Sequence, residues 1–545
     1  MYIINVIPLI KIPHPNPQIL SYFSENKIPI GFLVKISLRN KKLNALVVES
    51  KSLEQERLRL KKLSDFEIKP IEKVISKKPV LDHDQIKLLL WISDYYWTPV
   101  GMVARIFLSK KIPAYNKSSL VLTPQNKGMV FAPLNNLKSI IVNDESNDLY
   151  RSWGRKPYYN AKDIAIQLAK IHKAKLTLKS KLPSIETYYH VQNKEFKLEI
   201  LNTKCRVPNV NLVDMREEIK NRNPSTISRE LQEKLQNSNK SILFITRRGT
   251  STFVLCRECG YIANCPKCEV PMIYHEDKPS KKLVCHHCGK DDIAPVLCPN
   301  CKSIKIKYFG AGTQKLEKEA KNLFPNKKIF RLDSDISEKP NEQQKIIKEF
   351  NASNDTILIG SQMILNKNLR TNLVGIISLD TILGLPDFKS SERVFQTINR
   401  LRGMTDELFL LQTYHPENLA IKSAIENDFN KFYNEEIKIR KTFSYPPFSQ
   451  IIKLTYSHKD PIRAKNEPII LKAKLEQQIN SVFRNEDAKS KINLLGPVPA
   501  FIPKEKGLYK WNIVIKSKLS IEERNKLLII VPPAWEAEVD PDNLL

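Results

Sequence analysis

The chain has 545 residues, of which 41% are hydrophobic, and this length excludes one ordinary domain and favours three or four. Lys and Arg number 88 against 58 acidic residues, so the formal net charge of +30 favours a polyanionic partner, with nucleic acid foremost. Neither a signal-peptide pattern nor a run of about 18 apolar residues occurs, so we expect a cytoplasmic protein without a membrane-spanning helix.

Residues 1–112 contain short runs in which apolar and polar residues alternate, as in FLVKISLRN and LNALVVES. This period of two predicts a small β-rich N-terminal domain. A helical pattern follows over residues 84–108, where apolar residues recur three and four apart. Asp82 or Asp84 can cap the start of this helix, and Pro99 marks its end or a kink.

Further along, buried strands and amphipathic helices alternate, which predicts parallel α/β layers. From about residue 441 a last unit opens, with a helix over residues 465–483 and a strand over residues 511–517. The predicted elements of the α/β layers cover residues 139–144, 163–172, 175–179, 241–249, 314–324, 356–363, 373–380 and 408–414.

Eight of the nine cysteines form four Cys-x₂-Cys pairs within residues 256–301. In a reducing compartment such a cluster indicates a metal site more strongly than a disulfide framework. Each pair supplies two thiolates from one tight turn, so four pairs make two structural zinc sites with no open coordination position. His275, His286 and His287 could replace a ligand, but we expect them on the surface or behind the ligands.

Cysteine spacing leaves the pairing open. Sequential pairing is one possibility and nested pairing is the other. Nested pairing puts Cys256, Cys259, Cys298 and Cys301 on one ion and Cys265, Cys268, Cys285 and Cys288 on the second.

Several longer runs are more specific, among them LLLWISDYYWTPVG, SILFITRRGTSTFVLCRECGYIANCPKC, DTILGLPDFKSSERVFQT and LLGPVPAFIPKEKGLYKWNIVIKS. In this order the chain resembles the PriA family of replication-restart helicases from about residue 30 onward. The resemblance implies an α/β fold with RecA-like helicase lobes and the nested zinc pairing. The expected domains are a β-rich N-terminal DNA-binding domain (1–112), a truncated lobe 1 remnant (113–204), an intact lobe 2 (205–440) with a zinc-binding insertion (256–301), and an α+β C-terminal domain (441–545).

The chain departs from the family where ATP would bind. It contains no Gly-x₄-Gly-Lys-Ser/Thr phosphate loop. Asn143 stands where the resemblance implies the first carboxylate of Asp-Glu-Glu-His, and an amide lacks the charge that a magnesium site prefers. Met404 stands where it implies a finger arginine, with Arg402 two residues away. We therefore expect no catalytic residues and no bound ATP or Mg²⁺.

Three residues are candidate contacts to DNA or to a partner protein. Lys69 matches the lysine of the family's pocket for a 3′-terminal nucleotide, whereas Ser21 and Arg39 differ from the family's acidic residue and glycine. Trp91 and Tyr95 lie four apart on the predicted helix and resemble aromatics that receive the acidic tail of single-stranded-DNA-binding protein. Core packing is the alternative for both aromatics.

The leading hypothesis is a DNA-binding replication-restart protein for primosome assembly that recognises stalled or branched forks, binds two zinc ions and lacks helicase activity. Its expected partners are forked or single-stranded DNA, single-stranded-DNA-binding protein and other primosome components. One alternative is an active ATP-dependent 3′–5′ DNA helicase with an unrecognised nucleotide site. Another is a zinc-dependent interaction hub with little affinity for DNA.

Overall fold

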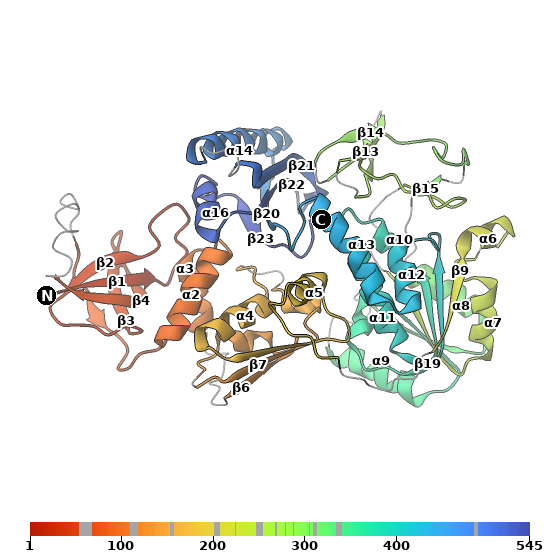
Figure 1. Cartoon of the computed structure of the whole chain (residues 1–545), viewed down its shortest axis with the longest axis horizontal. Helices are drawn as coiled ribbons and strands as arrows, with labels where there is room; N and C mark the ends of the chain where they lie inside the picture. Colours follow the sequence, from red (N-terminus) through yellow and green to blue (C-terminus); the bar gives the residue numbers. More distant parts are fainter. Residues whose placement is uncertain are drawn as a thin grey trace. The chain divides into compact units, whose positions relative to one another are not determined.

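A computed structural model of the chain divides into two compact units, which are described separately (Figure 1). Unit 1 comprises Met1–Tyr188, Ser449–Leu494 and Lys504–Asp542, and unit 2 comprises Tyr189–Phe448, Leu495–Pro503 and Asn543–Leu545. The structure describes all residues except 54–67, 110–117, 135, 153–156, 201–207, 224, 247–253, 268–269, 278–279, 287, 305, 309–312, 334–339, 484–488 and 545.

Unit 1 begins with an antiparallel sheet in the order β2-β1-β4-β3-β5, as the alternating pattern predicts. Alternate residues such as Ile4, Val34 and Val47 form its core. Residues 69–74 join its two edges, because the Phe23 amide donates to the Lys69 carbonyl at 3.0 Å while β5 pairs with β3. The strands are β1 (Tyr2–Pro8), β2 (Leu20–Ser24), β3 (Leu33–Leu38), β4 (Lys41–Ser52) and β5 (Lys73–Val74).

The helix predicted over residues 84–108 is two helices, α2 (His83–Tyr95) and α3 (Val100–Phe107). Asp82 is the N-cap: its carboxylate accepts from the Gln85 amide at 2.8 Å, and the Gln85 side chain accepts from the Asp82 amide at 3.1 Å. Pro99 is the N-cap residue of α3, so the proline marks a break and not a kink.

A parallel sheet in the order β6-β7-β8 follows in unit 1, with α4 packed on it. Its buried residues, including Ile140 and Val142, belong to one hydrophobic core with Leu89 of α2 and with Ile452 and Ile513 of the C-terminal segment. The elements are β6 (Ser119–Leu122), η2 (Lys127–Phe131), β7 (Ser139–Asn143), η3 (Asp148–Tyr150), α4 (Ala161–His172), β8 (Lys175–Lys179) and α5 (Ile185–Gln192).

The C-terminal segment forms a sheet in the order β21-β22-β20-β23, in which β20 pairs antiparallel with β22 and β23. The predicted helix over residues 465–483 is α14, which packs on β20 and β22. The elements are β20 (Gln450–His458), α14 (Pro461–Val482), β21 (Ile492–Glu505), β22 (Leu508–Ser517), α16 (Ile521–Leu528) and β23 (Glu536–Val539).

Unit 2 is built on a parallel sheet in the order β16-β17-β10-β18-β19-β9, which confirms the predicted α/β class. Its central strands are nearly continuous apolar runs, as expected for strands buried on both faces. The strands are β9 (Asn209–Asp214), β10 (Lys240–Ile245), β16 (Lys328–Leu332), β17 (Thr356–Gly360), β18 (Thr371–Ser378) and β19 (Thr405–Thr413). The helices are α6 (Met215–Lys220), α7 (Arg229–Asn237), α8 (Thr313–Leu323), α9 (Pro340–Ala352), η4 (Gln362–Asn366), α10 (Asp380–Leu383), α11 (Ser390–Arg402), α12 (Leu419–Glu426) and α13 (Phe429–Thr442).

The cysteine-rich segment interrupts unit 2 between β10 and α8. It forms two small sheets, β11-β15 and β12-β13-β14, around a separate core that includes Cys265 and Cys285. Its strands are β11 (Val254–Cys256), β12 (Ile273–Asp277), β13 (Ser280–Val284), β14 (Asp291–Ile293) and β15 (Ile306–Tyr308). Among the helices that the structure describes, none is both long and apolar enough to span a bilayer.

Candidate metal centre and DNA-binding site

The cysteine pairs share one backbone pattern. The amide of the first cysteine donates to the carbonyl five residues later, as from Cys285 to Lys290 at 2.8 Å and from Cys298 to Ser303 at 2.9 Å. Where the residue after the second cysteine is described, its amide returns a bond to the first cysteine's carbonyl, as from Gly289 to Cys285 at 2.9 Å. Each pair is therefore a closed turn that fixes both sulfurs.

The residue after the second cysteine lies in the left-handed region, with φ of +79° at Gly260, +80° at Gly289 and +60° at Lys302. Glycine adopts this conformation with little strain, which explains why two of these positions carry it. At Gly260 a Cβ would lie 2.6 Å from the Tyr414 carbonyl oxygen, so this turn also packs directly on the end of β19.

The structure groups the sulfurs in the nested arrangement. Cys256 Sγ lies 3.6 Å from Cys301 Sγ, and Cys259 Sγ lies 3.5 Å from Cys298 Sγ. The second group contains Cys265, Cys285 and Cys288, and Cys265 Sγ lies 3.6 Å from Cys288 Sγ. In each group all sulfurs lie within 4.8 Å of one another. Cys268, the fourth predicted member of the second group, lies outside the described residues.

These separations fit zinc. Four sulfurs at about 2.3 Å from a tetrahedral zinc ion lie roughly 3.8 Å apart, close to the values above. The sulfurs are too far apart for disulfide bonds, whose S–S length is about 2.05 Å. The first cysteine of each pair is completely buried, which shields that side of the site from water; these are Cys256, Cys265, Cys285 and Cys298.

The pKa values of individual cysteines are shifted in different directions, and Cys265 and Cys298 are examples of a rise and a fall. Burial raises the pKa of Cys265 to about 11, and the nearby Cys285 thiol adds to this rise. Burial also acts to raise the pKa of Cys298, but hydrogen bonds from the backbone amides of Cys301 and Asn300 outweigh it and lower the pKa to about 7. Because metal ligation requires thiolates, binding at either group releases protons.

His286 is not a surface residue, contrary to one of the two sequence-based expectations. It is 2% exposed, and its Nδ1 lies 2.8 Å from the Pro499 carbonyl oxygen in β21. The carbonyl oxygen can only accept, so Nδ1 carries the proton of this bond. His287 lies outside the described residues.

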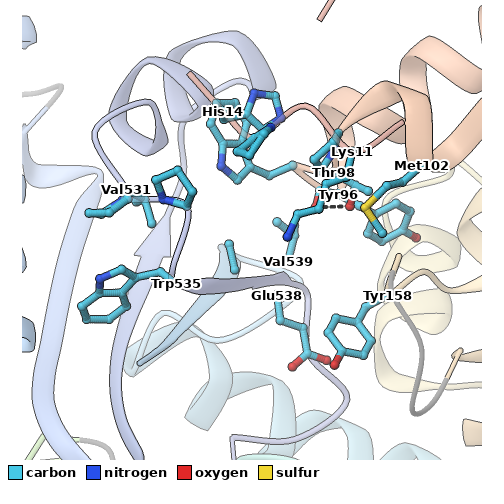
Figure 2. Close-up of a pocket in the computed structure, with 16 residues that line it drawn as sticks. Lys11, His14, Tyr96, Thr98, Met102, Tyr158, Val531, Trp535, Glu538 and Val539 are labelled. Atoms are coloured by element: carbon cyan, nitrogen blue, oxygen red, sulfur yellow. Dashed lines mark hydrogen bonds between the residues drawn. The ribbon is translucent and has the colours of Figure 1, made fainter. Parts of the chain in front are cut away.

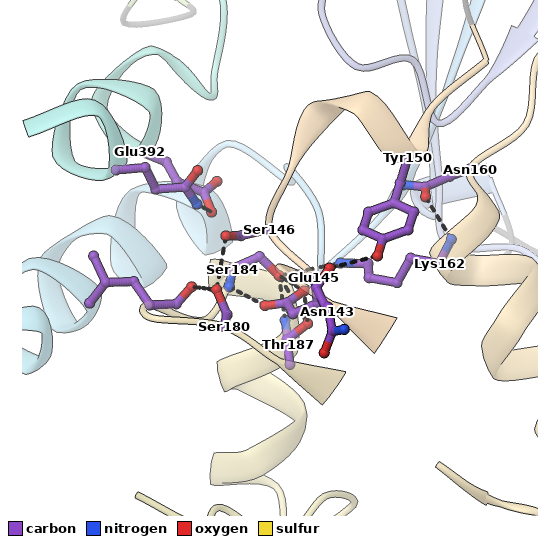
Figure 3. Close-up of polar contacts among 12 residues, drawn as sticks. Asn143, Glu145, Ser146, Tyr150, Asn160, Lys162, Ser180, Ser184, Thr187 and Glu392 are labelled. Carbon is purple, nitrogen blue, oxygen red and sulfur yellow. Dashed lines mark hydrogen bonds and ion pairs between the residues drawn. The ribbon is translucent and has the colours of Figure 1, made fainter. Parts of the chain in front are cut away.

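The residues that correspond to the family's magnesium motif begin at Asn143, the last residue of β7 in unit 1 (Figure 3). Glu145 is 3% exposed, and its carboxylate accepts from the Ser184 amide at 2.6 Å, from the Thr187 hydroxyl at 2.9 Å and from Lys162 Nζ at 3.0 Å. Burial alone would lower the pKa of Lys162, but Glu145 raises it above its usual value. Glu145 is thus occupied by internal partners that join the ends of β7 and β8 to α4 and α5.

Asn143 and Asp144 have local partners as well. The Asn143 carbonyl accepts from the Tyr150 hydroxyl at 2.6 Å, and the Asp144 carboxylate accepts from Asn147 Nδ2 at 2.7 Å. In unit 2, Arg402 donates to the Ala424 carbonyl and to Asn399 Oδ1, both at 2.9 Å. These contacts fix Arg402 within its own unit.

The three positions that correspond to the family's nucleotide pocket, of which only Lys69 matches, lie in or next to the strands of the N-terminal sheet. Ser21 is on β2, where its hydroxyl donates to Asn5 Oδ1 at 2.7 Å. Arg39 and Asn40 have positive φ values and form the two-residue turn between β3 and β4. Lys69 is exposed, and its carbonyl is bonded to Phe23 on β2, two residues from Ser21.

Trp91 and Tyr95 are half-buried on α2 and stacked on each other, with ring centroids 4.8 Å apart. The Tyr95 hydroxyl donates to Asp540 Oδ2 at 2.7 Å, and the guanidinium of Arg524 lies 6.0 Å from the Tyr95 ring. Arg524 is itself fully buried and donates to the Asp94 carbonyl at 2.6 Å. Tyr95 and Arg524 thus help to hold α2 against the C-terminal segment, a contact that no sequence pattern indicated.

A pocket lies beside these residues in unit 1 (Figure 2). His14 stacks on Trp97 with ring centroids 4.0 Å apart, and Trp535 lies across the pocket. The Glu538 carboxylate in its wall is neutralised by Arg151 at 2.9 Å and Lys453 at 3.5 Å. The lining is mostly aromatic and apolar, with Lys11 and Glu538 among its residues. Sequence analysis did not identify this site because its residues come from distant parts of the chain.

Comparison with known proteins shows the family to which the chain belongs. The Replication restart protein PriA of Rickettsia conorii is 30% identical over 477 residues, which cover 83% of this chain and 69% of that protein. This chain belongs to the PriA family. The PriA proteins of Bacillus subtilis and Borreliella burgdorferi are 34% and 35% identical over 72% of this chain, and the alignments cover 49% and 59% of those proteins. The chain thus spans about half to three-fifths of the length of these two PriA relatives.

Family models for PriA match three segments. A 3′DNA-binding domain matches residues 9–109, the Cys-rich region domain of PriA DNA helicase matches residues 265–291, and the C-terminal domain of primosomal protein N matches residues 441–538. The first match includes Ser21, Arg39, Lys69, Trp91 and Tyr95. The second includes Cys265, Cys268, Cys285 and Cys288, which we call the inner cysteine group.

Proposed function

We propose that the chain is a replication-restart protein that binds stalled or branched DNA forks, holds two zinc ions, and has lost the ATP-driven motor of its PriA relatives. The observation that carries this proposal is the contrast between two sites in one chain. The cysteine turns keep the geometry of metal sites, whereas Asn143 at the end of β7 replaces a carboxylate and the sequence contains no phosphate loop of the kind that ATP hydrolysis needs.

The zinc part of the proposal assigns one ion to each nested group. The outer ion would be held by Cys256, Cys259, Cys298 and Cys301, and the inner ion by Cys265, Cys268, Cys285 and Cys288. Bound zinc would supply a fixed cross-link between turns, because all four ligands are protein thiolates and no position remains for water or substrate. The cysteine turns themselves hold the sulfurs at the required separations.

The motor part rests on Asn143 and Glu145. Asn143 offers an amide where a magnesium site prefers charge. Glu145 is already bonded to Ser184, Thr187 and Lys162, so it is not free to orient water or a metal. We assign Glu145 a structural role.

DNA binding is proposed for the N-terminal domain and the basic surface. The match of residues 9–109 to a 3′DNA-binding domain supports it, as does the net charge of +30. Lys69 is the candidate contact to a terminal nucleotide, because it is exposed beside β2. The proposed domains are those expected from the sequence, with boundaries near residues 112, 204 and 440.

The partner proposal concerns Trp91 and Tyr95, whose stacked, half-buried rings suit the apolar part of an acidic peptide tail. We expect Trp91→Ala to weaken binding of the tail peptide of single-stranded-DNA-binding protein at least tenfold in fluorescence anisotropy. Trp97→Ala is the control, since Trp97 stacks on His14 instead. Equal loss in both variants would remove Trp91 from this role.

The alternative is an active ATP-dependent 3′–5′ helicase with an unrecognised nucleotide site. Asp144 is the residue that distinguishes the two hypotheses. The altered motif has two carboxylates, and Lys162 binds Glu145 whereas Asp144 is bonded to Asn147. ATP hydrolysis stimulated by forked DNA and abolished by Asp144→Asn would establish the alternative. An unchanged, DNA-independent background in both proteins supports the loss of the motor.

A further inference from the structure

A short part of β21 belongs to unit 2, although the residues on both sides of it belong to unit 1. Leu495–Pro503 belong to unit 2, whereas Ser449–Leu494 and Lys504–Asp542 belong to unit 1. We call residues 495–503 the strap. Its contacts in unit 2 are to the cysteine-rich insertion and to the adjoining core.

We call residues 285–290 the inner cysteine turn. One of its residues contacts the strap twice. His286 lies between Cys285 and Cys288, and its Nδ1–H donates to the Pro499 carbonyl at 2.8 Å. Its ring also packs edge-on against Phe501, with centroids 5.9 Å apart. Phe501 in turn packs on the hydrophobic core of unit 2. The His286 side chain is 2% exposed, so the bond is protected from water.

A second residue of the same turn, Gly289, lies close to the strap. Gly289 has φ of +80°, and a Cβ placed on it would lie 2.8 Å from Val498 Cγ1. A glycine is needed at this position for two reasons, the left-handed backbone and the contact with Val498. The strap therefore contacts this turn at two residues, His286 and Gly289.

The inner cysteine turn is closed by bonds of its own backbone. Two backbone hydrogen bonds close it, from Cys285 to Lys290 at 2.8 Å and from Gly289 to Cys285 at 2.9 Å. Its sulfurs face those of another turn, as Cys288 Sγ lies 3.6 Å from Cys265 Sγ. Small metal-binding turns of this kind gain their folding free energy from the bound ion, so the turn should loosen when the metal is removed.

We infer that the inner cysteine turn is a metal-dependent docking site for the strap, with His286 and Gly289 as the positioning residues. This inference rests on the proposed function, because it requires a metal at the inner group. Its consequence is that occupancy of the inner site controls the order of residues 495–503, a segment that is covalently continuous with the C-terminal sheet of unit 1.

Hydrogen exchange of the full-length protein tests the inference directly. The reporters are the amides of Val498, Ala500, Phe501 and Ile502, since the strap's prolines have none. We expect His286→Ala to speed their exchange by about fivefold to tenfold, the change expected for loss of one buried hydrogen bond. His286→Asn, which keeps a donor near the Nδ1 position, should restore part of the protection. Lys290→Ala is the matched control, because its exposed side chain belongs to the same turn.

Metal removal is the second arm. Cys288→Ser should reduce the metal count from two to one and speed strap exchange at least tenfold, while amides of β22 in unit 1, such as Ile513, keep their protection. A count of two in the wild-type protein, with unchanged strap exchange in both Cys288→Ser and His286→Ala, overturns the inference and leaves the proposed function intact. A wild-type protein without metal at the inner cysteines overturns both.

Discussion

At the scale of single residues, Glu145 shows how a buried carboxylate can be occupied entirely by partners within the protein. Its carboxylate accepts bonds from Ser184, Thr187 and Lys162 while being 3% exposed (Figure 3). Removing one partner of a buried pair leaves the other charge uncompensated, which costs more than the pair contributes in net terms. The importance of Glu145 for folding therefore says little about catalysis.

We expect Glu145→Ala to destabilise the protein by about 3 kcal/mol, because it removes a buried carboxylate that accepts from Ser184, Thr187 and the largely covered Lys162 ammonium. Glu145→Gln keeps one acceptor oxygen, which can serve the Ser184 amide, and should cost less. Urea unfolding followed by tryptophan fluorescence measures both. Asp84→Asn is the control, since the exposed Asp84–Lys87 pair should contribute only about 0.5 kcal/mol. A loss at Glu145 no larger than at Asp84 would contradict the structural role.

At the scale of elements, the cysteine turns combine a repeated backbone pattern with local packing. Gly260 and Gly507 separate these two contributions. Both have positive φ, +79° and +78°, but a Cβ at Gly260 would lie 2.6 Å from the Tyr414 carbonyl oxygen while one at Gly507 meets nothing within 4 Å. The turn around Gly260 is therefore specified by its packing on β19 as well as by its conformation.

Substitution of these two glycines by alanine should consequently have unequal effects. At Gly507 we expect only the conformational cost, about 1–2 kcal/mol. At Gly260 the Cβ must also displace backbone, so the loss of stability should be larger and zinc should pass faster to a chromogenic chelator. Thermal unfolding and the chelator assay measure the two effects. Identical behaviour of both variants would mean that the contact with Tyr414 does not constrain the turn.

Local sequence signals predicted much of the element structure. The capping box at Asp82 and the proline at Pro99 are local, so the start of α2 and the break before α3 could be read from the chain. The apolar strands β10, β17, β18 and β19 were predicted for the same reason. Strands β9 and β16 were not, because their mixed polar sequences, NVNLVD and KIFRL, carry no clear period.

Long-range contacts could not be predicted in this way. Cysteine spacing permitted both nested and sequential pairing, and only the fold brings Cys256 beside Cys301. The bond from His286 to Pro499 joins residues 213 apart in the sequence, and no local pattern marks it. The same holds for Tyr95 and Asp540, which are 445 apart.

At the scale of the whole molecule, the segment expected to be a lobe 1 remnant shares one hydrophobic core with α2 and the C-terminal sheet. A truncated α/β layer exposes apolar surface unless other elements cover it. In unit 1 that cover includes α2, whose residues such as Leu89 join the same core. The shared core explains how such a short parallel sheet can remain folded in this member of the PriA family.

The net charge of +30 makes a prediction at the same scale. If Lys and Arg contact phosphates, affinity for forked DNA should fall at least about tenfold between 50 and 200 mM salt, because counterions are released on binding. Fluorescence anisotropy with labelled forks and linear duplexes measures this slope and the fork preference together. Salt-independent binding without preference for forks would favour the zinc-dependent interaction hub over the proposed function.

The most direct test of the central claim combines two measurements on one preparation of the full-length protein. ATP hydrolysis is assayed with and without forked DNA, and bound metal is counted by elemental analysis. We predict two zinc ions per chain together with no DNA-stimulated hydrolysis. DNA-stimulated hydrolysis that is lost in Asp144→Asn, or a preparation of folded protein without zinc, would contradict this prediction.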